Sequence, residues 1–359
     1  MTIQAQMPIP AKPRPKSAAP WKVRGFSKIA VTTVASLLPA AMAITLGIFF
    51  DFSPPTILVI LFLPLQIVIA SIAALMVRGK RGMGDATLTV IVYFALALVT
   101  VLLGSVVVSV ITWGAKAMSL HFLYQNDVYI TPSTSLEYGG IGHAMIGSLV
   151  TVALVTVVTV PISIAIAVYL TEGYGRLRGA VRFFTQAMSG LPSVVSGLFI
   201  YAAFISIGSN RPAGWLGSAA LLLLMLPTVT RMSEEVLKLV PNELRSAALA
   251  LGAPRRRAFF QVIMPAARTG LVTAVLLGLA RIVGETAPLL LTIDFEHRTN
   301  ANPLSGGMAT MTTYIYSYLG AGYDTSRQRS WGAALVLLGL VAILFGIARL
   351  FANKKVGSR

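Results

Sequence analysis

Long runs of apolar residues, free of Asp, Glu, Lys and Arg, occur along most of the chain. A helix crosses the hydrocarbon core of a bilayer in about 20 apolar residues. Eight runs of about that length are 29–50, 52–77, 86–115, 138–171, 183–210, 212–230, 270–292 and 330–348. The seventh is apolar except for Arg281 and Glu285. The pattern predicts an all-α polytopic membrane protein with about eight transmembrane helices.

The composition supports this interpretation. Hydrophobic residues make up 56% of the chain and charged residues 11%, with a mean hydropathy of +0.78. A soluble domain carries about 25% charged residues. A single soluble core stops growing near this chain length and cannot bury so many apolar side chains. The composition therefore excludes a water-soluble globular protein and indicates membrane lipid as the surroundings.

The chain is strongly basic, with 29 Lys and Arg against 12 Asp and Glu. In a soluble protein this excess would suggest nucleic acid as the partner. In a membrane protein Lys and Arg collect in cytoplasmic loops. When the N-terminus is placed inside, the inner segments hold most of the 29 basic residues. We therefore expect a multi-pass inner or plasma membrane protein with both termini cytoplasmic and no nucleic-acid partner.

Three regions differ in character. Residues 1–28 are basic and proline-rich, which predicts a disordered cytoplasmic arm, and the long first span argues against a signal peptide. Residues 29–84 form an additional helix pair joined by a tight turn at Asp51–Pro55. Residues 85–359 form a six-helix core, with a long cytoplasmic loop at about 231–268. Every candidate for chemistry lies in this core.

Prolines fall within several predicted spans, namely Pro39, Pro64, Pro161, Pro192 and Pro227. Each removes a backbone hydrogen bond and bends or breaks its helix, and such kinks are either structural or part of a gate. The segment Ser189–Gly197 around Pro192 is rich in small residues. It permits close helix approach or a broken helix that lines a path.

Motifs for catalysis are missing from the sequence. It has no G-x-x-x-x-G-K-[ST] phosphate loop, no dinucleotide fingerprint, no G-x-S-x-G and no H-E-x-x-H. Cysteine is absent and there are only three histidines, so a thiolate or histidine metal site is not expected. The adjacent Glu234 and Glu235 would point apart on a helix. We therefore predict no catalytic residue, metal or cofactor on this chain, and a transporter or channel instead of an enzyme.

Arg281 and Glu285 are two charges within a predicted span, four residues apart and hence on one helical face. One interpretation is a self-neutralising pair that locks helices together. The other is an anion path, because the burial of charge needs a compensating function. An arginine meets an oxyanion with a planar fork and stays charged, while Glu285 would orient it or hold it until the anion arrives.

The predicted cytoplasmic loop contains a short amphipathic helix, from an N-cap at Asn242 to a stop at Gly252. Its apolar stripe at i, i+3, i+4 and i+7 is Leu244, Ala247, Ala248 and Leu251. The stripe could lie on lipid headgroups. However, two alanines make a better close-contact surface for a partner protein, which the run Arg255–Arg257 could steer by charge.

This loop resembles that of the inner membrane permeases of ABC importers. Their loop carries E-A-A-x-x-x-G, followed nine residues later by I-x-L-P. Here the pattern reads Ser246-Ala247-Ala248 then Gly252, and Val262-Ile263-Met264-Pro265. Ser246 replaces the glutamate of the family.

Within that family the chain looks most like phosphate permeases of the PstA type. The segments that carry this narrower resemblance are Gly139–Ile141, Pro192–Phe199, Leu226–Arg231 and Arg281–Leu290. The last of them is similar to the signature R-x-x-G-E-T-A-P-L-L. The resemblance covers residue 85 to the end of the chain and leaves the first two predicted helices outside.

The resemblance implies the membrane subunit of an ATP-driven phosphate importer. Its partners would be a second permease, two ATPase subunits that hold ATP and Mg²⁺, and an extracytoplasmic phosphate-binding protein. The implied phosphate path contains Arg281, Glu285, Thr286 and Arg231. The implied coupling surface for the ATPase contains Leu244, Ala247, Ala248, Leu251 and Gly252.

Other functions compete with this one. A permease for another oxyanion, such as sulfate or molybdate, would share the same residues. A secondary transporter or channel would need no ATPase, but its halves would show internal symmetry, which the sequence lacks. A scaffold without transport would leave Arg281 and Glu285 only their structural explanation.

Overall fold

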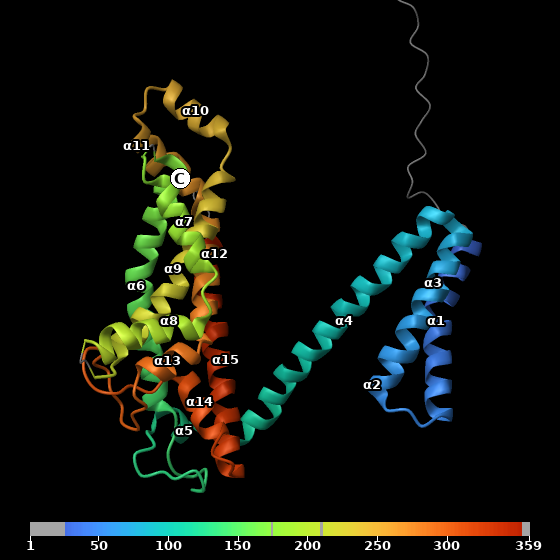
Figure 1. Cartoon of the computed structure of the whole chain (residues 1–359), viewed down its shortest axis with the longest axis horizontal. Helices are drawn as coiled ribbons and strands as arrows, with labels where there is room; N and C mark the ends of the chain where they lie inside the picture. Colours follow the sequence, from blue (N-terminus) through green and yellow to red (C-terminus); the bar gives the residue numbers. More distant parts are fainter. Residues whose placement is uncertain (1–25, 174, 209–210, 354–359) are drawn as a thin grey trace, which may run out of the picture. The chain divides into compact units, whose positions relative to one another are not determined.

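The computed structural model describes residues 26–173, 175–208 and 211–353, and within these ranges all regular structure is helical (Figure 1). The predicted arm over residues 1–28 falls almost wholly outside them. The α-helices are α1 (Phe26–Phe49), α2 (Pro54–Thr56), α3 (Leu63–Arg78), α4 (Lys80–Gly114), α5 (Leu120–Tyr124), α6 (Gly142–Glu172), α7 (Arg178–Ser189), α8 (Ser193–Ile200), α9 (Gly214–Lys238), α10 (Asn242–Ala250), α11 (Arg255–Ala258), α12 (Met264–Val283), α13 (Ala287–Thr292), α14 (Met311–Leu319) and α15 (Asp324–Asn353). Short π-helical or 3₁₀ segments are η1 (Ile57–Phe62), η2 (Ala115–Ala117), η3 (Tyr201–Ser206) and η4 (Phe259–Ile263).

The chain divides into two compact units, residues 1–106 and 107–359. In the first, α1 and α3 pack together as a hairpin. Asp51 adopts a positive φ of 53° in the connecting turn, a conformation that aspartate tolerates better than most residues. Gln66 Nε2 donates to the Ala35 carbonyl at 3.2 Å across the pair. These residues therefore form two packed helices joined by a short turn, and whether the pair crosses the membrane as predicted for residues 29–84 stays a prediction.

In the second unit α9 is the central helix. It packs against α6 on one side and α12 on another, and α12 also packs against α15. Leu221, Met225 and Val229 recur every four residues along α9 and are buried in one cluster with Val155 of α6 and Ile282 of α12. This i, i+4, i+8 spacing places them on one face, so burial of that face fixes the three long helices together.

The predicted fifth span is a broken helix. α7 and α8 meet at an angle of 107°, with Pro192 immediately before α8. Proline has no N–H to donate and disfavours helical geometry in the residue before it, which explains the break at this position. The small-residue segment Ser189–Gly197 therefore forms a bend and the start of α8, as one of its two interpretations expected.

Six helices of the described residues are long and apolar enough to cross a membrane, or seven if the bent pair counts as one span. The remaining predicted span, the first one at 29–50, corresponds to α1, which has 24 residues and includes a shorter apolar stretch at Thr33–Phe49. The all-α polytopic class is confirmed, and the count of about eight is broadly consistent. The prediction for the seventh span was wrong in one respect, because its helix ends at Val283 and not near residue 292.

Helix α5 and the loop that follows it lie at the end of the second unit opposite α10 (Figure 1), and this loop contains Asp127. Asp127 is fully buried, and Tyr318 donates to its Oδ2 at 2.5 Å. His297 Nδ1 and His143 Nε2 lie 2.9 and 3.2 Å from its Oδ1. Burial raises the pKa of Tyr318, and the hydrogen bond to the carboxylate raises it further, so the hydroxyl keeps the proton that it donates.

We expect Asp127→Ala to destabilise this end strongly, because the buried Tyr318 and His143 and the half-exposed His297 lose their common partner. A buried polar group that is left without its hydrogen-bond partner costs roughly 1–3 kcal/mol. Asp324→Ala is the control, since this aspartate is 89% exposed and its pair with Arg327 at 3.5 Å lies at the surface. Thermal unfolding of the purified protein in detergent measures both, and equal midpoints would contradict the structural role of Asp127.

Candidate functional site

Arg281 and Glu285 do not share a helical face, which corrects the prediction from their spacing. Helix α12 ends at Val283, and Gly284, with φ −93° and ψ 0°, leaves helical geometry. The next helix begins only at Ala287, with Pro288 in its first turn. No ion pair joins Arg281 to Glu285 in the part of the chain that the structure describes. The self-neutralising pair therefore has no geometric basis here.

Arg281 instead lies beside α9. Its Nη1 donates to Thr228 Oγ1 at 3.3 Å, while the Thr228 hydroxyl donates to the Leu224 carbonyl at 3.0 Å. The guanidinium is exposed on this chain and forms no ion pair with a described residue. A lipid-facing arginine at membrane depth is costly. This surface therefore needs an aqueous path or another protein against it.

Glu285 and Thr286 form the break between α12 and α13, and both are half-buried. Thr312 Oγ1 donates to the Glu285 carbonyl at 3.0 Å, which satisfies a backbone group freed by the break. The Thr286 carbonyl accepts from the amides of Leu289 and Leu290 at 3.1 Å each. Backbone at membrane depth is tolerated outside a helix only where protein or water satisfies it in this way.

The two broken segments pack against each other. A Cβ placed on Gly197 of α8 would lie 2.6 Å from Pro288 Cα of α13, so no larger side chain fits without movement. Helix α13 also packs against α9. This contact explains the small residue at position 197 and brings the segments Pro192–Phe199 and Arg281–Leu290 together, which the sequence placed about 90 residues apart.

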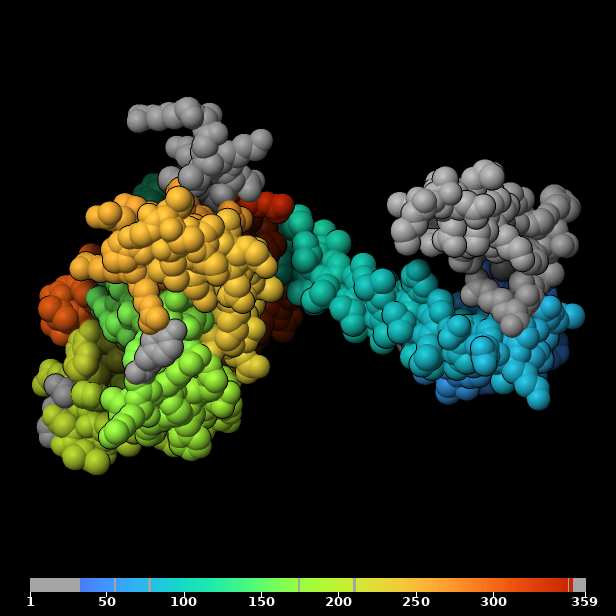
Figure 2. Space-filling model, turned by 90° about the horizontal axis from the view of Figure 1, so that it is seen from above, coloured from blue at the N-terminus to red at the C-terminus, as the bar shows by residue number. Residues whose placement is uncertain are grey.

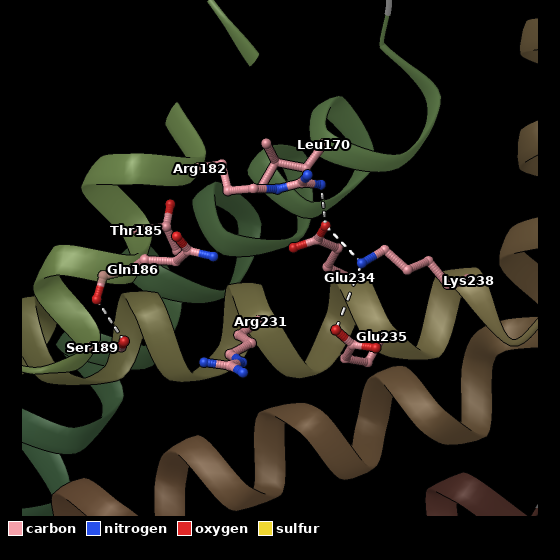
Figure 3. A pocket seen from close by; sticks show the side chains of 9 residues that line it. All are labelled: Leu170, Arg182, Thr185, Gln186, Ser189, Arg231, Glu234, Glu235 and Lys238. Carbon is pink, nitrogen blue, oxygen red and sulfur yellow. Dashed lines mark hydrogen bonds and ion pairs between the residues drawn. The ribbon is translucent and has the colours of Figure 1, made fainter. Parts of the chain in front are cut away.

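A polar pocket of about 200 Å³ lies between α7 and α9, at the end of the unit that carries α10 (Figure 3). Its lining residues are Leu170, Arg182, Thr185, Gln186, Ser189, Arg231, Glu234, Glu235 and Lys238. Arg182 Nη2 donates to Glu234 Oε1 at 2.7 Å, and Lys238 Nζ lies 2.9 Å from the same oxygen. Arg231 forms no ion pair with any described residue.

Of the predicted path residues, only Arg231 lines this pocket. Sequence reasoning missed Arg182, Lys238 and the polar side chains of α7. The alternation of Arg182 with apolar neighbours indicates an amphipathic helix, but its partner Glu234 lies 52 positions away and gives no local signal. As expected, Glu234 is buried whereas Glu235 is exposed, although Lys238 contacts both.

The predicted coupling loop is shorter than expected. Helix α9 extends through Arg231 to Lys238, and the helical segment that contains Arg268 starts at Arg255, so the loop proper covers about 239–254. Within it α10 spans Asn242–Ala250, and Gly252 follows with φ +80° as the predicted stop. The predicted N-cap was wrong by one residue, because Pro241 holds that position.

The stripe on α10 is divided between two surfaces. Ala248 is buried within this chain, whereas Leu244, Ala247 and Leu251 are exposed, Leu251 to 89%. Arg245 Nη2 donates to Glu172 Oε1 at 2.6 Å and fastens α10 to the end of α6. Figure 2, viewed from this end, shows the α10–α11 segment, in orange, on the surface of the unit.

The architecture is that of a polytopic membrane subunit with two broken helices, uncompensated arginines and a helix-bearing loop at one end. The profile of the family described as "Binding-protein-dependent transport system inner membrane component" matches residues 159–356, which is more than half of the chain. The chain belongs to this family. The match begins within α6, so α1, α3 and α4 lie outside it.

Three curated relatives narrow the comparison. The phosphate transport system permease protein PstA 1 of Mycobacterium tuberculosis (strain CDC 1551 / Oshkosh) is 39% identical over 207 residues, which is 57% of this chain and 68% of that protein. PstA of Pasteurella multocida (strain Pm70) is 36% identical over 249 residues, 69% of this chain and 86% of that protein. PstA of Yersinia pestis is 35% identical over 251 residues, with 69% and 83% coverage.

We expect Gly197→Val to separate α8 from α13, because its branched side chain would overlap the Pro288 backbone. Overpacking of this kind costs typically about 1–3 kcal/mol. Gly190→Ala, in the same broken span, is the matched control, since its Cβ would meet nothing nearer than 3.7 Å. A lower unfolding midpoint for Gly197→Val alone is the expected result, and equal midpoints would refute the close packing.

Proposed function

We propose that this chain is a transmembrane subunit of an ATP-driven phosphate importer and forms part of the anion path. One observation carries the proposal, namely that Arg281 is exposed on a spanning helix, contacts Thr228 and has no carboxylate partner among the described residues. The relatives named as phosphate transport permeases supply the substrate class.

An anion suits this arrangement better than a cation or a neutral solute does. The guanidinium of Arg281 presents a planar fork of N–H donors that matches two oxygens of a tetrahedral oxyanion. The Thr228 hydroxyl holds the arginine without neutralising it. Arg231 follows three residues later on α9 and extends the positive charge toward α10. Glu285 and Thr286 lie in the break beside Arg281 and would shape the path there.

The remaining parts of the importer lie on other chains in this proposal. A second permease would cover the exposed face that carries Arg281, and two ATPase subunits would bind ATP and Mg²⁺. An extracytoplasmic phosphate-binding protein would deliver the anion, and the chain itself would carry no cofactor.

The exposed stripe of Leu244, Ala247 and Leu251, with Gly252 following the helix, would contact an ATPase subunit, while the buried Ala248 packs α10 against its own chain. Both termini would then lie in the cytoplasm.

Arg281→Lys tests the anion path. The ammonium keeps the charge but cannot make the bidentate contact, so we expect phosphate uptake to fall about tenfold or more. Arg268→Lys is the control, because Arg268 is exposed near the other end of the same helix and should tolerate the change. Uptake of radiolabelled phosphate into proteoliposomes that contain the full transporter is the measurement.

Unchanged phosphate uptake by Arg281→Lys would refute the path role of this side chain. Sulfate and molybdate uptake by the unsubstituted transporter, measured in parallel, separate phosphate from the other oxyanions. Transport of one of them in preference to phosphate would move the assignment to that anion.

The coupling surface has its own test in Ala247→Asp. A carboxylate there would be buried in the docked interface without a partner, so we expect co-purified ATPase to fall about tenfold or more. Ser246→Asp is the matched control, because the exposed Ser246 lies on α10 outside the stripe of Leu244, Ala247 and Leu251. Equal ATPase recovery from both variants would contradict docking through the stripe.

A further inference from the structure

We propose that the pocket between α7 and α9 is a second oxyanion site, which holds phosphate at the end of the path that carries α10. Arg182 would turn from Glu234 to the anion when the site fills. The inference rests on the proposed function and adds a binding station with a release step. Its residues are Arg182, Arg231 and Gln186, with Lys238 as a supporting cation (Figure 3).

The charges of the pocket favour an anion. Three cations line it, Arg182, Arg231 and Lys238, against two carboxylates. Glu234 is shared by Arg182 and Lys238, and Lys238 also lies 3.6 Å from Glu235. Arg231 is left without a carboxylate among the described residues. One uncompensated positive charge in a concave site attracts anions from solution.

The donors of the pocket come from both of its walls. Arg231 lines the pocket from α9, and the Gln186 amide nitrogen, on α7, turns toward the space between the two helices (Figure 3). The hydroxyls of Thr185 and Ser189 already donate to carbonyls of α7, to Val181 at 2.8 Å and to Gln186 at 2.7 Å. The Thr185 hydroxyl remains able to accept from a protonated phosphate oxygen. The volume of about 200 Å³ exceeds that of one water, about 30 Å³, several times and holds a hydrated tetrahedral anion.

The pocket continues the line of charges from Arg281. Thr228, Arg231 and Glu235 occupy one face of α9 at i, i+3 and i+7. Arg281 contacts Thr228, and Arg231 lies three residues farther along, a rise of about 4.5 Å. An anion that leaves Arg281 therefore meets Arg231 and then the pocket.

Arg182 can leave Glu234 at little cost. The Arg182 side chain is 41% exposed, and Lys238 remains on the same carboxylate oxygen at 2.9 Å. Glu234 would thus keep a cation when Arg182 swings to the anion, and no buried charge would be left unpaired. Arg182 and Glu234 form an ion pair between α7 and α9 at this end. An anion that draws Arg182 away from Glu234 would therefore loosen α7, the helix that precedes the 107° bend. Binding of the anion would thus promote the opening between α7 and α9 through which the anion is released.

The absence of cysteine from the chain allows a direct test. Ser189→Cys places a thiol in the pocket without removing an anion donor, and Ala187→Cys places one on α7 outside it. We expect inorganic phosphate to slow thiol modification of Ser189→Cys in the assembled transporter, in a saturable manner, and to leave Ala187→Cys unaffected. The lipid is kept constant, so protection that rises with added phosphate comes from the free anion and not from headgroups.

When Arg182→Ala is combined with Ser189→Cys, the phosphate concentration that protects half of the thiol from modification should rise about tenfold. Added Arg176→Ala should not raise it, because Arg176 is exposed on the preceding loop and does not line the pocket. Absence of protection, or equal protection with and without Arg182, would overturn the second site. Phosphate uptake measured on the same samples separates the second site from the proposed function. Normal uptake without protection would overturn only the second site. An unsubstituted transporter that moves no phosphate would overturn the proposed function.

Discussion

The contact between Gly197 and Pro288 is the constraint on which the arrangement of the second unit depends. A helix that breaks within a membrane exposes backbone groups that lipid cannot satisfy. Here one break precedes α8 and the other precedes α13, and the two short helices pack on each other and on α9. Thr312 then donates to the Glu285 carbonyl at the second break. Each irregular segment is thus supported by the other, and Arg281 lies at the edge of this region.

This arrangement separates cations that are neutralised from cations that are not. Arg182, Lys238 and Arg245 all lie on carboxylates of their own chain. Arg231 and Arg281 do not, and they lie along one side of α9, about one helical turn apart in register. The carboxylates that could have neutralised them are committed elsewhere or lie in the break. These two uncompensated charges therefore follow one another along α9, as a path for an anion requires.

The sequence predicted the long helices well, because apolar length is a local signal that lipid enforces along the whole span. The prediction of a continuous helix from 270 to 292 was wrong at Glu285, although Gly284 and Pro288 together make such a helix unfavourable. The sequence could not have found the pocket, because Arg182 and Glu234 meet only through the packing of α7 on α9. For α10 it gave the apolar stripe and the stop at Gly252, but not that Ala248 faces its own chain, since periodicity does not say what covers a face.

The two ends of the second unit differ in how readily they can open. At the end opposite α10, Asp127 and Arg329 are fully buried, and Arg329 donates through Nη2 to the carbonyls of Thr134, Ser135 and Tyr138. Separation of such groups leaves buried charges unpaired, which is expensive. At the α10 end the Arg182–Glu234 pair is partly exposed, and Lys238 contacts Glu234 as a second cation that stays when Arg182 leaves. The Arg245–Glu172 pair, only half-buried, links α10 to α6 at this same end. A force applied to α10 by a docked ATPase would therefore act first on α6, α7 and α9 around the pocket, and the opposite end would respond last.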